Sequence, residues 1–148
     1  MKKMSCIILA AGAGTRLRSE MPKALHEICG EPMIVHLLRT IEGLIDARTV
    51  VVVGFARKKL EKTLQDRGYK KIRYAVQPRQ LGTGHAVRCA SDYFKRYAGD
   101  ILVVMGDAPL LTRKTLEQLI ERHHHQDATA TILTCLLYTS PSPRDLPT

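Results

Sequence analysis

Three loops of the sequence place glycines beside polar or charged side chains, directly after runs of apolar residues. The first, residues 9–17, reads LAAGAGTRL, and its small residues let backbone N–H groups approach a phosphate without steric interference. Arg16 in this loop and Lys23 further along the chain supply two cations. The combination predicts a phosphate-binding loop with Arg16 and Lys23 as catalytic cations.

Two other glycine-rich motifs compete for this loop, and each lacks a required residue. A dinucleotide-binding fingerprint needs a small residue where Leu17 is bulky, and a P-loop needs Gly-Lys-Ser/Thr. Arg16 or Lys23 alone would be interpreted as solvated surface charge. Together with the glycines they fit phosphoryl or nucleotidyl transfer, in which negative charge builds on the α-phosphorus and the departing pyrophosphate.

The second loop, residues 77–86, reads QPRQLGTGHA. The side-chain amides of Gln77 and Gln80 can donate to and accept from a pyrimidine edge, and Gly82 lets a base lie close to the backbone. An ordinary polar turn before a helix explains the same spacing equally well. The third loop begins with Gly106 and Asp107 after an apolar run.

A carboxylate at the end of a buried strand is well placed to hold Mg²⁺, although an isolated Gly-Asp also fits a simple turn. The position of Asp107 favours the metal.

The run His123-His124-His125 is also a possible ligand cluster. Consecutive residues of a helix point in different directions, so we interpret these histidines as a solvated helix end.

The loops depend on elements that alternate along the chain. Apolar runs without polar alternation, typical of strands buried on both faces, occupy residues 6–9, 50–53, 72–76, 101–105 and 128–133. Helical periodicity covers residues 34–45, 56–67, 84–97 and 112–120. This alternation predicts an α/β fold with a doubly wound, mostly parallel sheet. Such sheets bind ligands beyond the carboxyl ends of their strands, where all three loops would meet.

Composition narrows the class of protein. The 148 residues suffice for one domain, and the net charge of +9 suits a phosphorylated partner. The basic residues are scattered, and two Phe, five Tyr and no Trp give little to stack on bases, which argues against nucleic acid. Lys2 and Lys3 followed by the largely apolar residues 4–11 resemble the start of a signal peptide, but this stretch is too short and runs directly into glycine-rich sequence, so we reject that interpretation. No segment approaches the length of a membrane span. Four widely spaced cysteines are typical of reduced, mostly buried thiols in a cytoplasmic protein.

The last residues, 136–148, do not continue the pattern. Pro141, Pro143 and Pro147 exclude a further helix or interior strand. We therefore expect a domain over residues 1–135, followed by a tail that is either an appended, non-native segment or a naturally disordered end. We also expect the domain to be truncated.

Four motifs carry a resemblance to a known family. They read LAAGAGTR at residues 9–16, MPKALH at 21–26, QLGTGHA at 80–86 and GDAPL at 106–110. Over about residues 5–135 the chain resembles the uridylyltransferase domain of the bacterial bifunctional N-acetylglucosamine-1-phosphate uridylyltransferases/glucosamine-1-phosphate acetyltransferases, which have a Rossmann-like, nucleotide-diphospho-sugar transferase fold. The glycine-rich loop and the lysine are common to sugar nucleotidyltransferases, whereas QLGTGHA is much more specific to this family.

The resemblance implies transfer of UMP from UTP to N-acetylglucosamine 1-phosphate with Mg²⁺, a cytoplasmic step in the supply of peptidoglycan and lipopolysaccharide precursors. Arg16 and Lys23 would neutralise phosphates, and Asp107 would hold the metal. The implied nucleotide-binding residues are Leu9, Ala10, Ala11, Gly12, Gly14, Thr15, Lys23, Gln77, Gln80, Gly82 and Thr83, the last four selecting uracil.

The chain departs from the family in two ways. Met105 stands where the resemblance leads us to expect a tyrosine. The family's sugar-binding loop, a second metal ligand, and the β-helix for acetyl transfer and trimer formation would all lie beyond residue 135. We therefore expect this chain to be inactive alone and prone to aggregate. Two alternatives stay open, namely another nucleotidyltransferase of the same fold, for a cytidine or guanosine substrate, and a nucleotide-binding fragment without turnover.

Overall fold

The computed structural model describes residues 3–12, 21–54 and 56–134, divided between a unit that ends at Arg113 and a second unit from Lys114. The first unit contains a four-stranded sheet in the order β5-β4-β1-β6. Its strands are β1 (Met4–Ala10), β4 (Thr49–Val53), β5 (Arg73–Val76) and β6 (Asp100–Met105). All three pairings are parallel, which confirms the predicted sheet.

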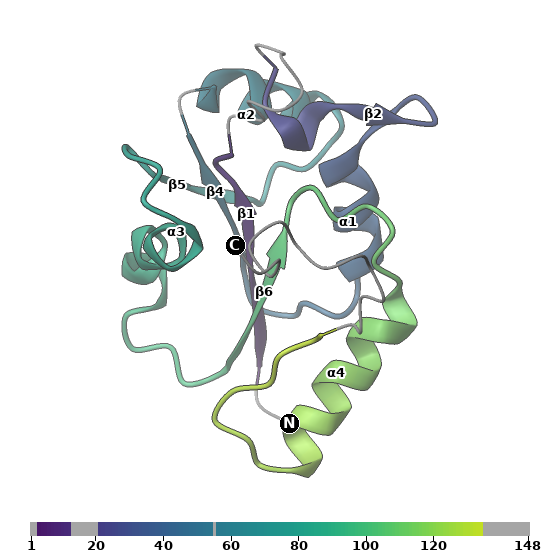
Figure 1. Cartoon of the computed structure of the whole chain (residues 1–148), viewed down its shortest axis with the longest axis vertical. Coiled ribbons are helices and arrows are strands. Elements are labelled where there is room, and N and C mark those ends of the chain that lie inside the picture. The colour runs from purple at the N-terminus through teal and green to yellow at the C-terminus, as the bar shows by residue number, and fades with distance from the viewer. Residues whose placement is uncertain (1–2, 13–20, 55, 135–148) are drawn as a thin grey trace, which may run out of the picture. The chain divides into compact units, whose positions relative to one another are not determined.

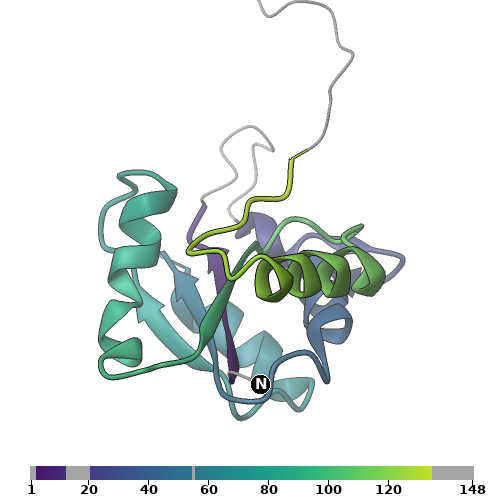
Figure 2. The same cartoon turned by 90° about the horizontal axis from the view of Figure 1, so that it is seen from below.

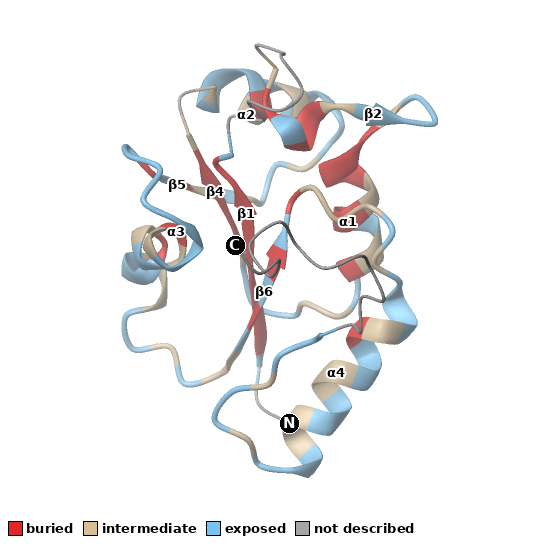
Figure 3. Ribbon diagram, in the orientation of Figure 1, coloured by how far each residue is buried: buried red, intermediate tan, exposed pale blue. Residues whose placement is uncertain are grey.

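The central strands are buried on both faces, as their unbroken apolar sequences predict. Every residue of β1 is buried, and so are the last four residues of β4. Figure 3 shows these two strands as the continuous buried centre of the unit. The outermost strand β6 differs from these central strands, because Ile101, Val103 and Met105 are each at least 40% exposed.

Helices cover both faces of the sheet. They are α1 (Met33–Ile41), α2 (Arg57–Asp66) and α3 (Thr83–Cys89). Figures 1 and 2 show α3 on one side of the sheet and α1 on the other. Ala86 and Ala90 pack in one cluster with Ile7, Leu9 and Val50, which are alternate positions of β1 and β4. The predicted doubly wound α/β fold is therefore confirmed.

The order of the strands fixes where a ligand can bind. From β1 the chain moves outward to β4 and β5, and it then returns through α3 to β6 on the other side of β1. The direction of winding thus reverses between β1 and β6. In open α/β sheets the crevice for ligands lies at this reversal, beyond the carboxyl ends of the two strands.

Three local elements of this unit differ from the sequence predictions. The helix predicted over residues 34–45 ends at Ile41. The helix predicted over residues 84–97 ends at Cys89 and is followed by a 3-10 helix, η3 (Ser91–Phe94). A small hairpin, β2 (Glu27–Ile28) with β3 (Glu31–Pro32), was not predicted. Its two turn residues, Cys29 and Gly30, have φ of 52° and 78°, and two positive φ values are what tight hairpin turns require.

The second unit holds nearly all of α4 (Arg113–His125), which overlaps the helix predicted over residues 112–120. The strand predicted over residues 128–133 is wrong, since these residues form neither strand nor helix. Ile132 is 81% exposed. β-branched residues favour a strand only where a neighbouring strand completes the hydrogen bonds, and the described part of this unit contains no other strand.

Candidate functional site

The carboxyl ends of β1 and β6 lie in close contact. The amide of Gly106 donates to the carbonyl oxygen of Leu9 at 2.9 Å. A Cβ at position 106 would lie 3.1 Å from that oxygen and 3.2 Å from the Cβ of Ala10, so only glycine fits without displacing its neighbours. This close approach starts the Asp107 loop directly beside the end of β1.

Lys23 and Asp107 meet at this edge. Lys23 begins the 3-10 helix η2 (Lys23–Leu25), whose Ala24 and Leu25 are buried and anchor it. Its Nζ lies 2.5 Å from Oδ2 of Asp107, although the two residues are 84 positions apart in the sequence. The side chains are 46% and 24% exposed, so water and a ligand can reach both. A cation and a carboxylate thus stand together where the winding reverses.

The loop after β5 reaches the same place. Nε2 of Gln80 donates to the carbonyl oxygen of Ala11, the residue after β1, at 2.6 Å. Gly54, directly after β4, also lies against Ala11, because a Cβ at position 54 would be 2.7 Å from the same oxygen. The first and second sequence loops are therefore in contact around one backbone carbonyl.

Gln77 holds the second loop through hydrogen bonds of its side-chain amide. Its side chain is buried, and its Nε2 donates to the carbonyl oxygen of Gly82 at 3.1 Å and to Nδ1 of His85 at 3.0 Å. An accepting Nδ1 leaves the ring proton on Nε2, which faces Sγ of Cys89 at 3.9 Å. Gly82 has φ of 96°, a conformation that favours glycine. Gln77 thus holds the shape of the loop.

The remaining predicted residues are placed as follows. Leu9, Ala10 and Ala11 are buried at the carboxyl end of β1. Exposed residues are Gly12, Gln80, Gly82 and Thr83. Gly14, Thr15 and Arg16 lie outside the described residues. Of the predicted set, the structure brings Ala11, Lys23, Gln77, Gln80, Gly82 and Asp107 to one edge of the sheet.

Two residues that support this edge were missed by the sequence analysis. Gly54 directly follows the apolar run of β4, and that position could have been recognised as a third carboxyl end. His85 was seen only as part of a motif, because nothing in the spacing indicates its hydrogen bond to Gln77. Both act on the backbone of the loops.

The side chains at this edge suit a hard divalent cation. Mg²⁺ is bound at phosphoryl-transfer sites by one or two carboxylates together with phosphate oxygens and waters. Asp107 offers a partly exposed carboxylate at the right place. Among residues 3–12, 21–54 and 56–134 no three acidic, histidine or cysteine side chains gather into a full ligand set. Asp107 alone fits this mode of binding.

The fold and this edge define a doubly wound α/β domain with a lysine–aspartate pair at the winding reversal, where such domains bind their ligands. The chain belongs to the family of MobA-like NTP transferase domains, whose model matches residues 6–136. No helix within the described ranges combines the length and apolar character needed to cross a membrane.

Relatives at high identity share one name. The chain is 47% identical over 143 residues to the bifunctional protein GlmU of Latilactobacillus sakei subsp. sakei, covering 97% of the chain and 29% of that protein. It is 45% identical over 130 residues to the bifunctional protein GlmU of Lactococcus lactis subsp. lactis, covering 88% of the chain and 28% of that protein. The chain thus spans less than a third of the length of these relatives.

Solved structures share the fold at lower identity. Rv0371c from Mycobacterium tuberculosis aligns with a TM-score of 0.68 at 19% identity, over 81% of this chain and 60% of that one. The structure of Rv0371c in complex with manganese aligns with a TM-score of 0.64 at 18% identity, over 80% of this chain and 58% of that one. HddC from Yersinia pseudotuberculosis, complexed with GMP-PN, aligns with a TM-score of 0.65 at 22% identity, over 83% of this chain and 54% of that one.

Proposed function

We propose that this chain is the nucleotide-holding part of a uridylyltransferase that transfers UMP from UTP to N-acetylglucosamine 1-phosphate. The observation that carries the proposal is the Lys23–Asp107 pair at the winding reversal, with the Gln80 loop bound to Ala11 beside it. The proposal is further supported by the four sequence motifs and by relatives named as bifunctional GlmU proteins.

In the reaction, a phosphate oxygen of the sugar phosphate attacks the α-phosphorus of UTP, and the bond to the β-phosphate oxygen breaks. Pyrophosphate leaves, and UDP-N-acetylglucosamine remains. Lys23 begins paired with Asp107. When the triphosphate binds, Lys23 Nζ exchanges this carboxylate for phosphate oxygens, where it offsets the charge that builds in the transition state. Arg16 serves as the second cation.

The same exchange frees Asp107 to hold a divalent metal. A manganese complex of a protein with the same fold supports a metal of this kind, and we propose Mg²⁺. Bound there, Mg²⁺ would neutralise phosphate oxygens of the triphosphate. Asp107 would otherwise repel the triphosphate, so its carboxylate has to be shielded before the nucleotide can bind tightly.

Gln80 supplies a chemical reason for preferring uracil. Its Nε2 is engaged by Ala11, and its Oε1 makes no hydrogen bond to any described residue. A free amide oxygen can accept from N3–H of uracil, whereas N3 of cytosine is an acceptor and would face that oxygen unfavourably. A hydrogen bond replaced by an unsatisfied contact costs about 1–3 kcal/mol, or roughly 5- to 150-fold in affinity.

The test is a titration of the chain with UTP and with CTP in the presence of Mg²⁺. We expect UTP to bind at least about fivefold more tightly, and Gln80→Ala to remove most of that preference without unfolding the protein. Gln65→Ala is the matched control, because Gln65 is an exposed glutamine in α2 whose side chain forms no hydrogen bond with the described residues. Equal binding of UTP and CTP would remove the main support for uridylyl transfer.

A second candidate is nucleotide binding without turnover, because the chain spans less than a third of its relatives. Release of pyrophosphate from UTP and N-acetylglucosamine 1-phosphate discriminates between the two. Turnover would reject the inert alternative, and tight UTP binding without pyrophosphate release would support it. A cytoplasmic location, and a trimer for the full-length protein only, remain part of the proposal.

A further inference from the structure

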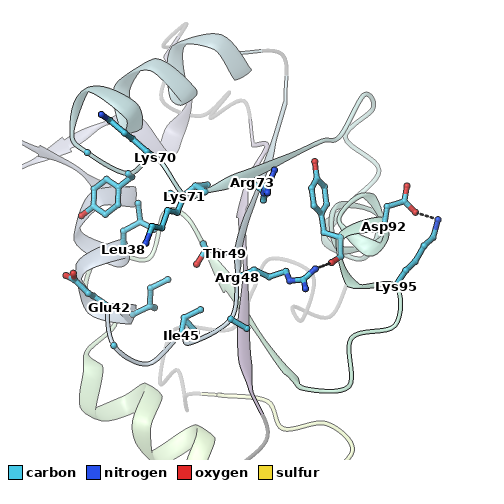
Figure 4. Close-up of a pocket in the computed structure, with 17 residues that line it drawn as sticks. Leu38, Glu42, Ile45, Arg48, Thr49, Lys70, Lys71, Arg73, Asp92 and Lys95 are labelled. Carbon is cyan, nitrogen blue, oxygen red and sulfur yellow. Dashed lines mark hydrogen bonds and ion pairs between the residues drawn. The ribbon is translucent and has the colours of Figure 1, made fainter.

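A cavity lies at the end of the sheet opposite Lys23 and Asp107, where the strands begin. It has a volume of about 1110 Å³ and opens beneath the amino ends of β4 and β5, where Thr49 and Arg73 begin their strands. Figure 4 shows the side chains that line it. Pockets that hold small molecules have volumes of roughly 300–1,000 Å³, so a small organic ligand fits.

This cavity gathers basic residues that are separated in the sequence. Four of them, named here the amino-edge cluster, are Arg48, Lys70, Lys71 and Arg73. The acidic residues that line the same cavity are Glu42 and Asp92, and Asp92 is paired with Lys95 at 2.8 Å. Within the described part of the chain, no carboxylate forms an ion pair with Lys70, Lys71 or Arg73. The cations of the cavity therefore outnumber its carboxylates, and the cavity carries a net positive charge.

The parallel register explains why these cations meet. Arg73 pairs with Val50, so Lys71 and Arg48, two residues before each, fall at matching positions ahead of β5 and β4. Arg48 is held in place, because its guanidinium donates to the carbonyl oxygen of Tyr93 and lies 5.5 Å from the ring centre of Tyr97. Figure 4 shows Arg48 directed at that carbonyl, with Arg73 at the start of β5 nearby.

The wall of the cavity is not uniformly polar. Leu38, Ile41, Ile45 and Ile72 line it together with Tyr69 and Tyr93. Leu38 and Ile41 are both buried, which fixes this apolar surface. A site with several cations beside apolar and aromatic side chains is suited to an organic anion rather than to a bare inorganic ion, since both parts of such a ligand find a partner.

We propose that the amino-edge cavity binds an organic anion that carries two phosphate groups on separate carbon atoms, at a site distinct from the carboxyl-edge nucleotide site. Phosphates contact Lys70, Lys71 and Arg73, and the carbon skeleton covers the apolar wall. Arg48 adds charge from a fixed position. This second site does not depend on the proposed uridylyl transfer, because none of its residues lies at the carboxyl edge.

The test uses isothermal titration of the full chain with fructose 1,6-bisphosphate as the organic probe and inorganic pyrophosphate as the bare anion. We expect the organic bisphosphate to bind several-fold more tightly than pyrophosphate, to weaken as NaCl is raised, and to keep its affinity when UTP and Mg²⁺ are saturating. Displacement by UTP, or equal affinity for the two probes, would overturn the proposal.

Charge-matched variants locate the site. The double variant Lys71→Glu/Arg73→Glu is expected to lower the affinity for the organic probe at least tenfold, while the affinity for UTP changes less than twofold. The control, Lys58→Glu/Lys59→Glu, makes the same change in net charge on exposed positions of α2 and should leave the probe within twofold of wild type. Equal weakening by both pairs would show a general charge effect and overturn the site. If the first pair does not fold, Lys70→Gln/Lys71→Gln gives the same test without charge reversal.

Discussion

Gly54→Ala should destabilise the protein by closing the space between β4 and β1. Its Cβ would lie 2.7 Å from the carbonyl oxygen of Ala11, and both that oxygen and the added carbon belong to strand ends that cannot rotate away. Overpacking of this kind costs about 1–3 kcal/mol. Replacing glycine also restricts the unfolded chain, which returns roughly 0.4–1 kcal/mol. Because 2.7 Å is shorter than Cβ atoms normally approach a neighbour, the upper half of the overpacking range applies, and the net loss should be about 1–2 kcal/mol.

Urea denaturation measures this loss directly. With a dependence of about 2 kcal/mol per molar urea, the unfolding midpoint should fall by about 0.5–1 M. UTP affinity should also fall, because the displaced Ala11 carbonyl is the acceptor for Gln80. Gly84→Ala is the matched control, since its Cβ would meet nothing within 4 Å and α3 gains a better helix former. A midpoint for Gly54→Ala at or above wild type, or an equal fall for Gly84→Ala, would refute this reasoning.

Four other outcomes are expected. Lys23→Ala should change the free energy of unfolding by less than about 1 kcal/mol, as for other exposed ion pairs, yet weaken Mg²⁺–UTP binding in a titration at least tenfold. Asp107→Asn should reduce the dependence of UTP binding on Mg²⁺, measured by the same titration over a metal series. Gln77→Leu should lower the free energy of unfolding by about 1–3 kcal/mol in urea, because the carbonyl of Gly82 loses its donor. Burial raises the pKa of Cys6 to about 12, so at pH 8 a thiol reagent should modify exposed Cys29 and leave Cys6 unmodified until the protein unfolds.

The framework of the fold could be predicted because its strands are buried on both faces. The run at residues 50–53 was extended by one residue, to Thr49–Val53, and the run at 101–105 became Asp100–Met105. A short, unbroken apolar run that lies between two segments of clear helical periodicity fits a buried strand better than any other element. The strand prediction for residues 128–133 was wrong because β-branched residues only favour extended backbone. A strand also needs a neighbouring strand within hydrogen-bonding distance.

The site was only partly accessible to sequence reasoning. The motifs identified Lys23 and Asp107 one by one, but their 2.5 Å separation depends on how η2 packs and on the glycine that lets β6 approach β1. The hydrogen bonds of Gln77 and Gln80 to backbone carbonyls could not be predicted, because any polar side chain has many potential partners along the chain. The amino-edge cluster was missed for a related reason, since scattered cations meet only after the strands are paired.

The most direct test of the central claim is where UTP binds, measured by NMR on glycine amides at the two edges of the sheet. Gly82 and Gly106 report on the carboxyl edge, whereas Gly43 and Gly68 line the amino-edge cavity. As UTP is titrated from below to well above its dissociation constant in the presence of Mg²⁺, the Gly82 and Gly106 signals should shift and saturate together, while those of Gly43 and Gly68 stay in place. Shifts confined to Gly43 and Gly68, or no shifts at millimolar UTP, would contradict the account.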